Sequence, residues 1–224
     1  MKPMSLILEV TQRCNLRCGH CLRGEPRNVD MTLKTALKAI RWLRSGRVRF
    51  ILGFSGGEPL LNLKMLGKLI QVAEKEQFRW EGFWMTTNGT LMTPEVVELL
   101  ERYAALSLSR NPNASCVGIS DGKWHRAARR AAGIELPERP VGDRIYFFQG
   151  GTPDSALIAE GRLGGRDYRG PRKEPRIVYI TADGKVLPSA ETAYDNQIRE
   201  QARSLNEWLR VTEHKFNAER MGKA

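Results

Sequence analysis

Short apolar runs alternate with stretches of helical periodicity through the first half of the chain. The apolar runs are Ser5–Val10, Arg49–Phe54 and Phe83–Thr87. Apolar residues recur at helical spacing after each run, and these stretches begin at Thr32, Asn62 and Thr93. Parallel strands need a crossover between them and helices to cover their faces. Three strand–helix units in succession therefore predict an α/β fold built on a parallel sheet.

The second half of the chain is less regular. The strands expected there are Cys116–Ser120, Arg144–Gln149, Ala156–Ala159, and a hairpin of Arg176–Thr181 with Lys185–Leu187. We also expect a basic helix over 123–132, a loop over Gly161–Pro175, and a last helix through Ile198, Leu205, Trp208 and Leu209. Leu106–Ser109 is an alternative fourth strand. No boundary divides the pattern, so we expect one domain over 1–224, with 1–125 carrying the motifs below and 126–224 completing the fold.

Composition narrows the class of protein. The 224 residues include 36 Lys+Arg and 25 Asp+Glu, a formal net charge of +11, and 41% are hydrophobic. That hydrophobic share supports a buried core, and no stretch approaches the roughly 20 consecutive apolar residues of a membrane-spanning helix. The N-terminus lacks the apolar stretch and cleavage site of a signal peptide. We therefore expect a cytoplasmic protein with no membrane partner.

Three of the four cysteines gather in one short segment. Cys14, Cys18 and Cys21 have the spacing C-x3-C-x2-C, and Cys116 lies far away in the sequence. Such a cluster in a cytosolic protein indicates a metal site. Three thiolates on one loop can hold three corners of an iron–sulfur cube and leave the fourth iron open. A zinc site, with or without His20 as a further ligand, is the alternative.

Two further motifs follow the next predicted strands. Gly56-Gly57-Glu58-Pro59 comes after the second strand and Thr87-Asn88-Gly89 after the third. Each could be an ordinary turn when taken alone. In order behind the cysteines, however, they resemble the motifs of the radical S-adenosylmethionine (radical SAM) enzymes along residues 5–125.

The resemblance implies a role for each matching residue. Cys14, Cys18 and Cys21 would ligate a 4Fe–4S cluster, and the methionine part of S-adenosylmethionine would chelate the open iron. The residues implied in binding S-adenosylmethionine are Gly56, Gly57, Glu58, Pro59, Thr87 and Asn88. Among these, the glycines would let the backbone approach the ligand, and Glu58 with nearby carbonyls would receive its ammonium group. One electron would break the C5′–S bond and give a 5′-deoxyadenosyl radical, which takes hydrogen from a second substrate.

Other matches to the family are weaker. Ser120 and Asp121 are similar to a fourth-strand segment that meets the ribose or the methionine carboxylate, with His125 following, although a turn and an exposed histidine explain them equally well. Arg162 resembles a Gly-Arg strand end that contacts adenine. Cys116 is expected to be a buried thiol. No catalytic residue is assigned.

The length of the chain suggests a partial (βα)6-type TIM barrel, open on one side, with the cofactor site at the C-terminal strand ends. Larger relatives carry a cysteine-rich extension with auxiliary clusters. Here Ser189 stands where a cysteine would be sought, so we expect one cluster only.

The positive charge is concentrated in two segments. One is the predicted helix with Lys123, Arg126, Arg129 and Arg130, and the other is the loop with Arg162, Arg166, Arg169, Arg172, Lys173 and Arg176. Such segments bind RNA or nucleotide phosphates, acidic peptides, or an electron donor such as flavodoxin or ferredoxin, or they are simply solvated.

Together these patterns predict a radical SAM enzyme, an oxidoreductase or transferase, with one 4Fe–4S cluster. An open barrel admits a large substrate, which favours a peptide or protein side chain, and an RNA base or nucleotide is the alternative. A non-catalytic iron–sulfur or zinc-binding module is the alternative of another class.

Overall fold

The computed structural model describes residues 3–109, 115–135, 146–150, 177–187 and 203–210. Its strands form a single sheet in the order β5-β4-β3-β2-β1-β6-β7-β8. They are β1 (Met4–Thr11), β2 (Phe50–Gly56), β3 (Gly82–Thr87), β4 (Ser115–Ser120), β5 (Tyr146–Gly150), β6 (Ile177–Ile180), β7 (Lys185–Leu187) and β8 (Arg203–Ser204). Neighbours from β5 through β1 to β6 pair in parallel, and β7 and β8 add antiparallel pairs. The predicted α/β fold with a parallel sheet is confirmed.

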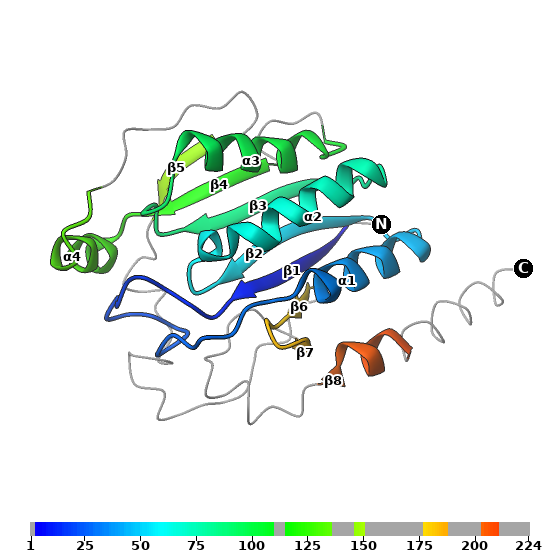
Figure 1. Ribbon diagram of the computed structural model, residues 1–224, viewed down its shortest axis with the longest axis horizontal. Helices are drawn as coiled ribbons and strands as arrows, with labels where there is room; N and C mark the ends of the chain where they lie inside the picture. The colour runs from blue at the N-terminus through cyan, green and yellow to red at the C-terminus, as the bar shows by residue number, and fades with distance from the viewer. Residues whose placement is uncertain (1–2, 110–114, 136–145, 151–176, 188–202, 211–224) are drawn as a thin grey trace, which may run out of the picture.

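Helices cover one face of this sheet (Figure 1). They are α1 (Leu33–Ser45), α2 (Leu63–Lys75), which follows the 3-10 turn η1 (Pro59–Asn62), and α3 (Pro94–Ala105). The hydroxyls of Thr32 and Thr93 accept hydrogen bonds from the first turns of α1 and α3, as expected of N-caps. A fourth helix, α4 (Lys123–Ala131), lies beyond the strand ends and away from this layer.

The main hydrophobic core lies between the sheet and α1–α3. Phe54, Phe83 and Tyr103 pack ring to ring there, with centroids 4.9–5.4 Å apart. Tyr103 is fully buried, and its hydroxyl donates to the Leu66 carbonyl at 2.7 Å. Buried aromatic rings contribute more apolar area than any other side chains, so this cluster accounts for much of the packing between the layers.

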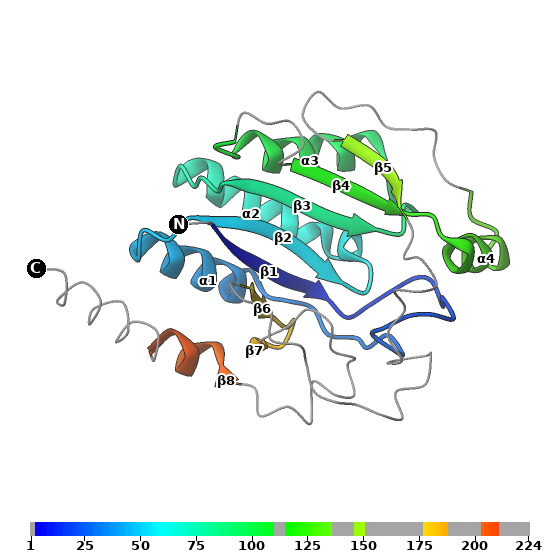
Figure 2. The ribbon, with the colours of Figure 1, turned by 180° about the vertical axis from the view of Figure 1, so that it is seen from behind.

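The opposite face of the sheet carries a smaller apolar cluster. Ile7, Tyr179 and Leu187 are buried in it, and Trp84 packs against it. The Trp84 ring lies over Gly53, where a Cβ atom would come within 2.5 Å of it. No described helix covers this face, which Figure 2 shows from behind.

The second half follows the prediction in part. The hairpin of β6 and β7 is present, and residues 205–210 are helical with Leu205 and Leu209 buried. Leu106–Ser109 makes only a single bridge, from Ser107 to Trp80, so Ser115–Ser120 is the fourth strand. The predictions for 156–159, 161–175, Ile198 and Ser189 lie outside the described residues, as does the Cys116 side chain. No helix in the described part of the chain is long and apolar enough to span a membrane.

Candidate functional site at the strand ends

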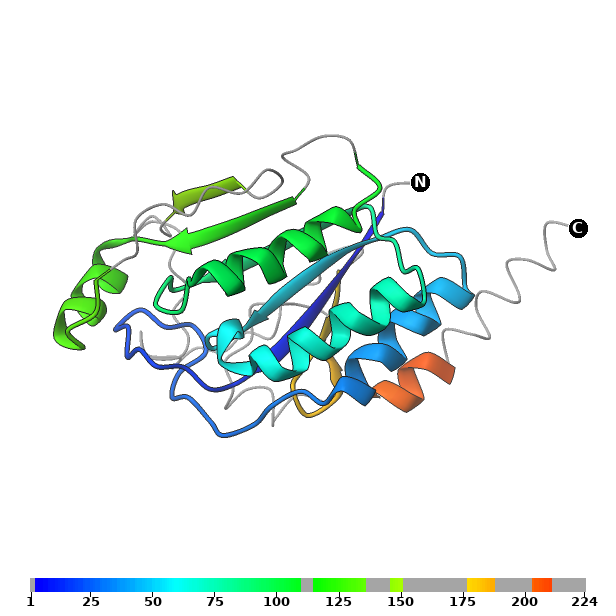
Figure 3. The same ribbon diagram turned by 45° about the horizontal axis from the view of Figure 1, so that its top comes forward.

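The predicted motifs meet at one edge of the sheet. The three cysteines follow β1, the Gly-Gly-Glu-Pro segment follows β2, and Thr87-Asn88 ends β3. In parallel strands these are all C-terminal ends, where α/β folds place their sites. Figure 3 shows the connection from β1 to α1, in blue, curving outward at this edge. We call residues 12–29 the cysteine loop.

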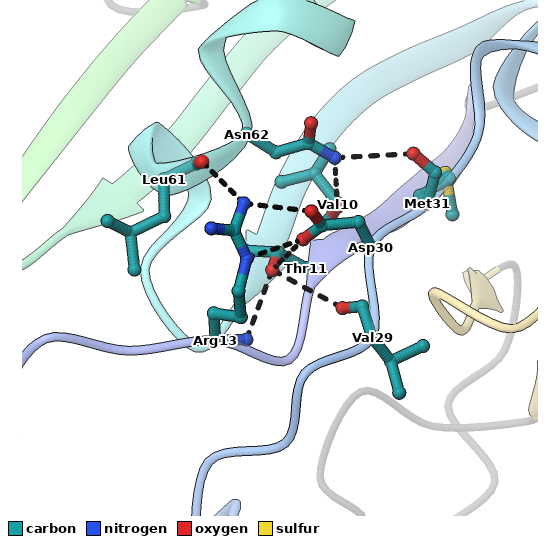
Figure 4. A network of polar contacts seen from close by, with 8 residues as sticks. All are labelled: Val10, Thr11, Arg13, Val29, Asp30, Met31, Leu61 and Asn62. Atoms are coloured by element: carbon teal, nitrogen blue, oxygen red, sulfur yellow. Dashed lines mark hydrogen bonds and ion pairs between the residues drawn. The ribbon is translucent and has the colours of Figure 1, made fainter.

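The cysteine loop is closed at its base by a polar network, which we call the neck (Figure 4). Thr11 and Asp30 form an antiparallel bridge, and the Thr11 hydroxyl donates to the Asp30 carboxylate at 2.5 Å. Arg13 binds the same carboxylate at 2.8 Å and also donates to the Leu61 carbonyl at 2.7 Å. The Asn62 amide donates to the carbonyls of Val10 and Met31 at 2.7 and 3.2 Å. The neck therefore joins both ends of the loop to the start of α2.

Gly56 and Gly57 pack against the cysteine loop itself. A Cβ atom on Gly56 would lie 2.1 Å from the Thr11 carbonyl oxygen, and one on Gly57 would lie 2.2 Å from that of Arg13. Gly56 also has a φ of +137°, which side chains other than hydrogen rarely allow. The amides of Gly57 and Glu58 donate to those two carbonyls at 2.9 and 2.8 Å. The observed role of these glycines is to let the end of β2 contact the backbone of the cysteine loop. Their contact with S-adenosylmethionine stays a prediction.

Glu58 is a fully buried carboxylate that joins the ends of β2 and β3. It accepts hydrogen bonds from the Thr87 hydroxyl at 2.8 Å, the Asn88 amide at 2.7 Å and the Leu60 amide at 3.1 Å. Burial raises the pKa of Glu58 to about 7, although each of these hydrogen bonds lowers it. The side chain expected to receive an ammonium group is therefore already engaged by three donors of its own chain.

Asn88 connects the end of β3 to the cysteine loop. Its side-chain amide donates to the Asn15 oxygen at 2.9 Å and lies 3.9 Å from the Cys14 sulfur. Its own oxygen accepts from the Thr90 hydroxyl at 2.7 Å. A contact between Asn88 and a thiol positions this residue to influence any metal that the sulfur binds.

None of the three cysteines forms a disulfide, and Cys18 is buried whereas the other two are partly exposed. Burial is the main reason that the pKa of the Cys14 thiol is raised. The Cys21 amide donates to the Cys18 carbonyl at 3.1 Å, so these two residues share a turn. A metal bound here would have to displace the thiol protons, as thiolate ligation requires.

The cysteine loop offers three sulfur donors for a metal centre, and their assignment as ligands stays a prediction. Among the described residues, no three His, Cys, Asp or Glu side chains lie close enough together to hold one metal ion. A zinc ion keeps its sulfurs about 2.3 Å from one point, whereas a cubane cluster spreads three thiolates over three irons. Three sulfur donors on one short loop are the donor type and number that a cubane cluster with one open iron needs.

Helix α4 lies against the outer side of the cysteine loop. A Cβ atom on Gly19 would meet the Trp124 ring at 2.9 Å, and the His20 and His125 rings meet edge to face at 4.6 Å. Burial, followed by the charges of His20 and Arg129, lowers the pKa of His125 to about 4. Trp124 Nε1 and His125 Nδ1 are buried without a hydrogen-bond partner in the described part of the chain.

Two buried polar groups here were not predicted from the sequence. Arg129 donates to the carbonyls of Asn88 and Ser120 at 3.0 and 2.8 Å, and it forms an ion pair with Asp121. Asp121, predicted to meet the cofactor, thus lies at the site edge and is engaged by Arg129. The available signal was that this helix has only one large apolar side chain, Trp124, so one of its charged residues could be the buried one.

Glu9 is the second unpredicted group. It is fully buried on β1 and accepts from the Tyr179 hydroxyl at 2.7 Å, the Gln12 amide at 3.0 Å and the Ala182 backbone amide at 3.0 Å. The signal for it was an acidic residue inside an otherwise apolar strand. Arg162 lies outside the described residues.

Comparison with known proteins agrees with this arrangement. The family model of the radical SAM superfamily matches residues 8–114, which include the cysteine loop and the ends of β2 and β3. Over residues 8–114 the chain is therefore similar to the radical SAM superfamily. This superfamily uses a 4Fe–4S cluster and S-adenosylmethionine, and the matched residues include the cysteine loop.

Curated relatives match less than half of this chain. An uncharacterised protein of Methanocaldococcus jannaschii is 35% identical over 97 residues, 43% of this chain and 34% of the relative. An S-adenosylmethionine-dependent nucleotide dehydratase of Siniperca chuatsi is 31% identical over 94 residues, and a GTP 3′,8-cyclase of a Synechococcus strain is 32% identical over 97. These matches cover 41% and 42% of this chain, and 26% and 28% of the two relatives. The chain thus spans about a third or less of the length of these curated relatives.

Solved structures share the fold of this chain over most of its length. BtrN in an open conformation superposes with a TM-score of 0.52 at 15% identity, covering 92% of this chain and 77% of BtrN. SuiB of Streptococcus suis, bound to its precursor peptide, gives a TM-score of 0.51 at 13% identity, covering 93% of this chain and 64% of SuiB. The predicted partial TIM barrel is therefore confirmed.

Proposed function

We propose that the protein is an enzyme that cleaves S-adenosylmethionine reductively at one 4Fe–4S cluster held by Cys14, Cys18 and Cys21. The observation that carries this proposal is the placement of the three thiols. They stand on one loop, closed at its neck, at the edge of the sheet where Glu58 and Asn88 also lie. We assign the activity to a single domain over residues 1–224, located in the cytoplasm.

A 4Fe–4S cluster held by Cys14, Cys18 and Cys21, together with S-adenosylmethionine, would supply the difficult chemistry, which is reductive cleavage of S-adenosylmethionine and removal of a hydrogen atom from the second substrate. The chain holds and orients these groups. Glu58 fixes the ends of β2 and β3 through Thr87 and Asn88, and the glycine backbone is locked to the cysteine loop. These contacts set the geometry of the edge before any ligand binds, which is the preorganisation that catalysis needs.

For the second substrate we propose a peptide or protein side chain. The supporting observation is the fold that the chain shares with a protein that binds a peptide. SuiB, which shares the fold, was solved with a precursor peptide bound.

A nucleotide or RNA base is the second candidate. The net charge of +11 favours phosphate groups, and two of the three relatives named above are a nucleotide dehydratase and a GTP 3′,8-cyclase. The reaction outcome on either substrate is not assigned.

The test is anaerobic reconstitution with iron and sulfide, followed by reduction in the presence of S-adenosylmethionine. We expect the wild-type protein to turn brown, to contain about four irons, and to release 5′-deoxyadenosine. Cys18→Ala should lose both cluster and product, whereas Cys116→Ala, the matched control outside the loop, should retain both. Iron content and mass spectrometry measure the two outcomes.

Three other results would each contradict the proposal in a different way. A colourless protein that binds zinc would support the zinc module. An intact cluster without 5′-deoxyadenosine at any substrate tested would support a non-catalytic iron–sulfur module. A cluster retained in Cys18→Ala would show that the ligand assignment is wrong.

A further inference from the structure

Helix α4 has an unusual surface for a helix of an α/β protein. Its only buried residue is Arg129, so none of its apolar side chains enters the core. Lys123, Arg126 and Arg130 are exposed along it. Asp121 is already shared between Arg129 and Arg126. The outer side of α4 is therefore a positively charged surface, which we call the α4 patch, defined by Lys123, Arg126 and Arg130.

The α4 patch lies next to the thiols. The views in Figures 1, 2 and 3 all place α4 beside the cysteine loop, and the Trp124 ring packs directly on Gly19, the residue after Cys18. The His20 and Trp124 rings stack with centroids 6.1 Å apart, and the Lys123 ammonium lies 5.3 Å from the Trp124 ring. An aromatic layer thus separates the charged surface from the loop that carries the cysteines.

The proposed reaction needs one electron from outside the chain for each turnover. Electron transfer weakens steeply with distance, so the donor must dock close to the cysteine loop. A surface of one charge sign steers a partner of the opposite sign and raises its association rate.

We infer that the α4 patch is the docking surface for an acidic one-electron carrier protein, with Trp124 and His20 between the docked carrier and the cluster. This inference rests on the proposed function. The carrier is oxidised by one electron, and that electron reduces the cluster.

A protein carrier fits the α4 patch better than a nucleic acid does. The aromatic layer lies beneath the charged surface, packed on the loop, so its faces are not presented for base stacking as in single-strand binding proteins. That position suits a short path for an electron. Nucleic-acid binding at the patch is the competing outcome that the test must separate.

The test compares reduction of the reconstituted cluster by two donors in stopped flow. The probes are fully reduced bacterial flavodoxin, an acidic carrier, and reduced methyl viologen, a small cation that needs no docking surface. Lys123→Glu/Arg130→Glu is the test variant, because both side chains are exposed. Lys64→Glu/Lys68→Glu on α2 is the matched control, with the same change in net charge on exposed residues of another helix.

At low ionic strength we expect the α4 variant to slow reduction by flavodoxin by about tenfold or more, with no slowing of reduction by methyl viologen. The α2 control should change the flavodoxin rate by less than about threefold. The difference should shrink toward zero at roughly 0.5 M salt, where screening removes steering. Lys123→Gln/Arg130→Gln should give an intermediate rate and guards against a folding defect in the reversal variant.

Equal flavodoxin rates in the α4 variant and the α2 control would overturn the docking proposal while leaving the proposed function intact. The same conclusion would follow if the α4 variant lost binding to a fluorescent 20-nucleotide RNA but kept its flavodoxin rate. A wild-type protein that forms no cluster would overturn the proposed function, and the docking proposal with it.

Discussion

The carboxyl group of Glu58 lies in a setting that opposes its ionisation. Its carboxyl group is fully buried, and burial raises its pKa to about 7 from 4.5. The folded protein therefore keeps this proton up to about pH 7, whereas the unfolded chain releases it near pH 4.5. Between these values the folded state binds more protons, so the free energy of unfolding falls as the pH rises.

We predict that the unliganded wild-type protein loses roughly 2–3 kcal/mol of stability to Glu58 between pH 5 and 8. Glu58→Gln cannot ionise and should remove this contribution. Urea unfolding of both proteins at several pH values measures it. The difference in free energy of unfolding between the two proteins cancels the contributions of other titrating groups. His125 is one of them: its pKa is lowered, so below pH 6.5 it makes the free energy of unfolding rise with pH. A difference that does not change with pH would contradict the prediction.

Gly57 allows a backbone contact that no other residue permits. A Cβ atom there would lie 2.2 Å from the Arg13 carbonyl oxygen, so the cysteine loop would have to move. We predict that Gly57→Ala destabilises the protein by roughly 2–4 kcal/mol and lowers its iron content after reconstitution.

The chain offers a matched control for this change. Gly67 lies within α2, and a Cβ atom there would meet nothing within 4 Å. Gly67→Ala should therefore stabilise the protein by about 0.5–1 kcal/mol, because alanine is the better helix former. Opposite signs for the two Gly→Ala changes are expected in thermal unfolding, and equal effects would mean that the loop tolerates the contact.

At the scale of elements, one side chain fastens α4 to the sheet. The Arg129 side chain is only 4% exposed and joins the ends of β3 and β4 through two carbonyls and Asp121. Since α4 buries no apolar residue, little else binds it to the neighbouring strands.

We predict that Arg129→Met destabilises the protein by roughly 2–4 kcal/mol, because it leaves Asp121 and the two carbonyls without their shared donor. Amides of α4 should then exchange with deuterium at least about tenfold faster, while those of α1 and α2 keep their protection. Arg130→Met, at the exposed neighbour, should leave exchange in α4 nearly unchanged. A uniform loss of protection across the chain would instead show that Arg129 stabilises the whole fold and not α4 alone.

The strand–helix units were predictable because their periodicity is local. Thr32 and Thr93 cap the helices that were expected to begin there, and the first three strands match within two residues at each end. The pairing of β6 with β1 was not predictable, since the choice of partner strand depends on contacts about 170 residues apart in sequence.

The site was predictable only where spacing carries the chemistry. The three cysteines can be recognised from the sequence because a cluster needs several thiolates on one short loop. Arg129 and Glu9 cannot be recognised in this way, because a charged side chain becomes buried only when residues distant in the sequence supply its hydrogen-bond partners. For Glu9 these partners are Tyr179 and Ala182, on and after β6.

Across the whole molecule, the neck separates the cysteine loop from the barrel that carries it. The bridge between Thr11 and Asp30 holds the two ends of the loop at a fixed spacing, whatever the segment between them does. Doubling the length of a closed loop costs only about 0.6 kcal/mol of closure entropy. Insertions and deletions between these anchors need not disturb strand register. The barrel can thus accept cysteine loops of different lengths, so the reactive edge is free to diversify in evolution while the scaffold stays constant.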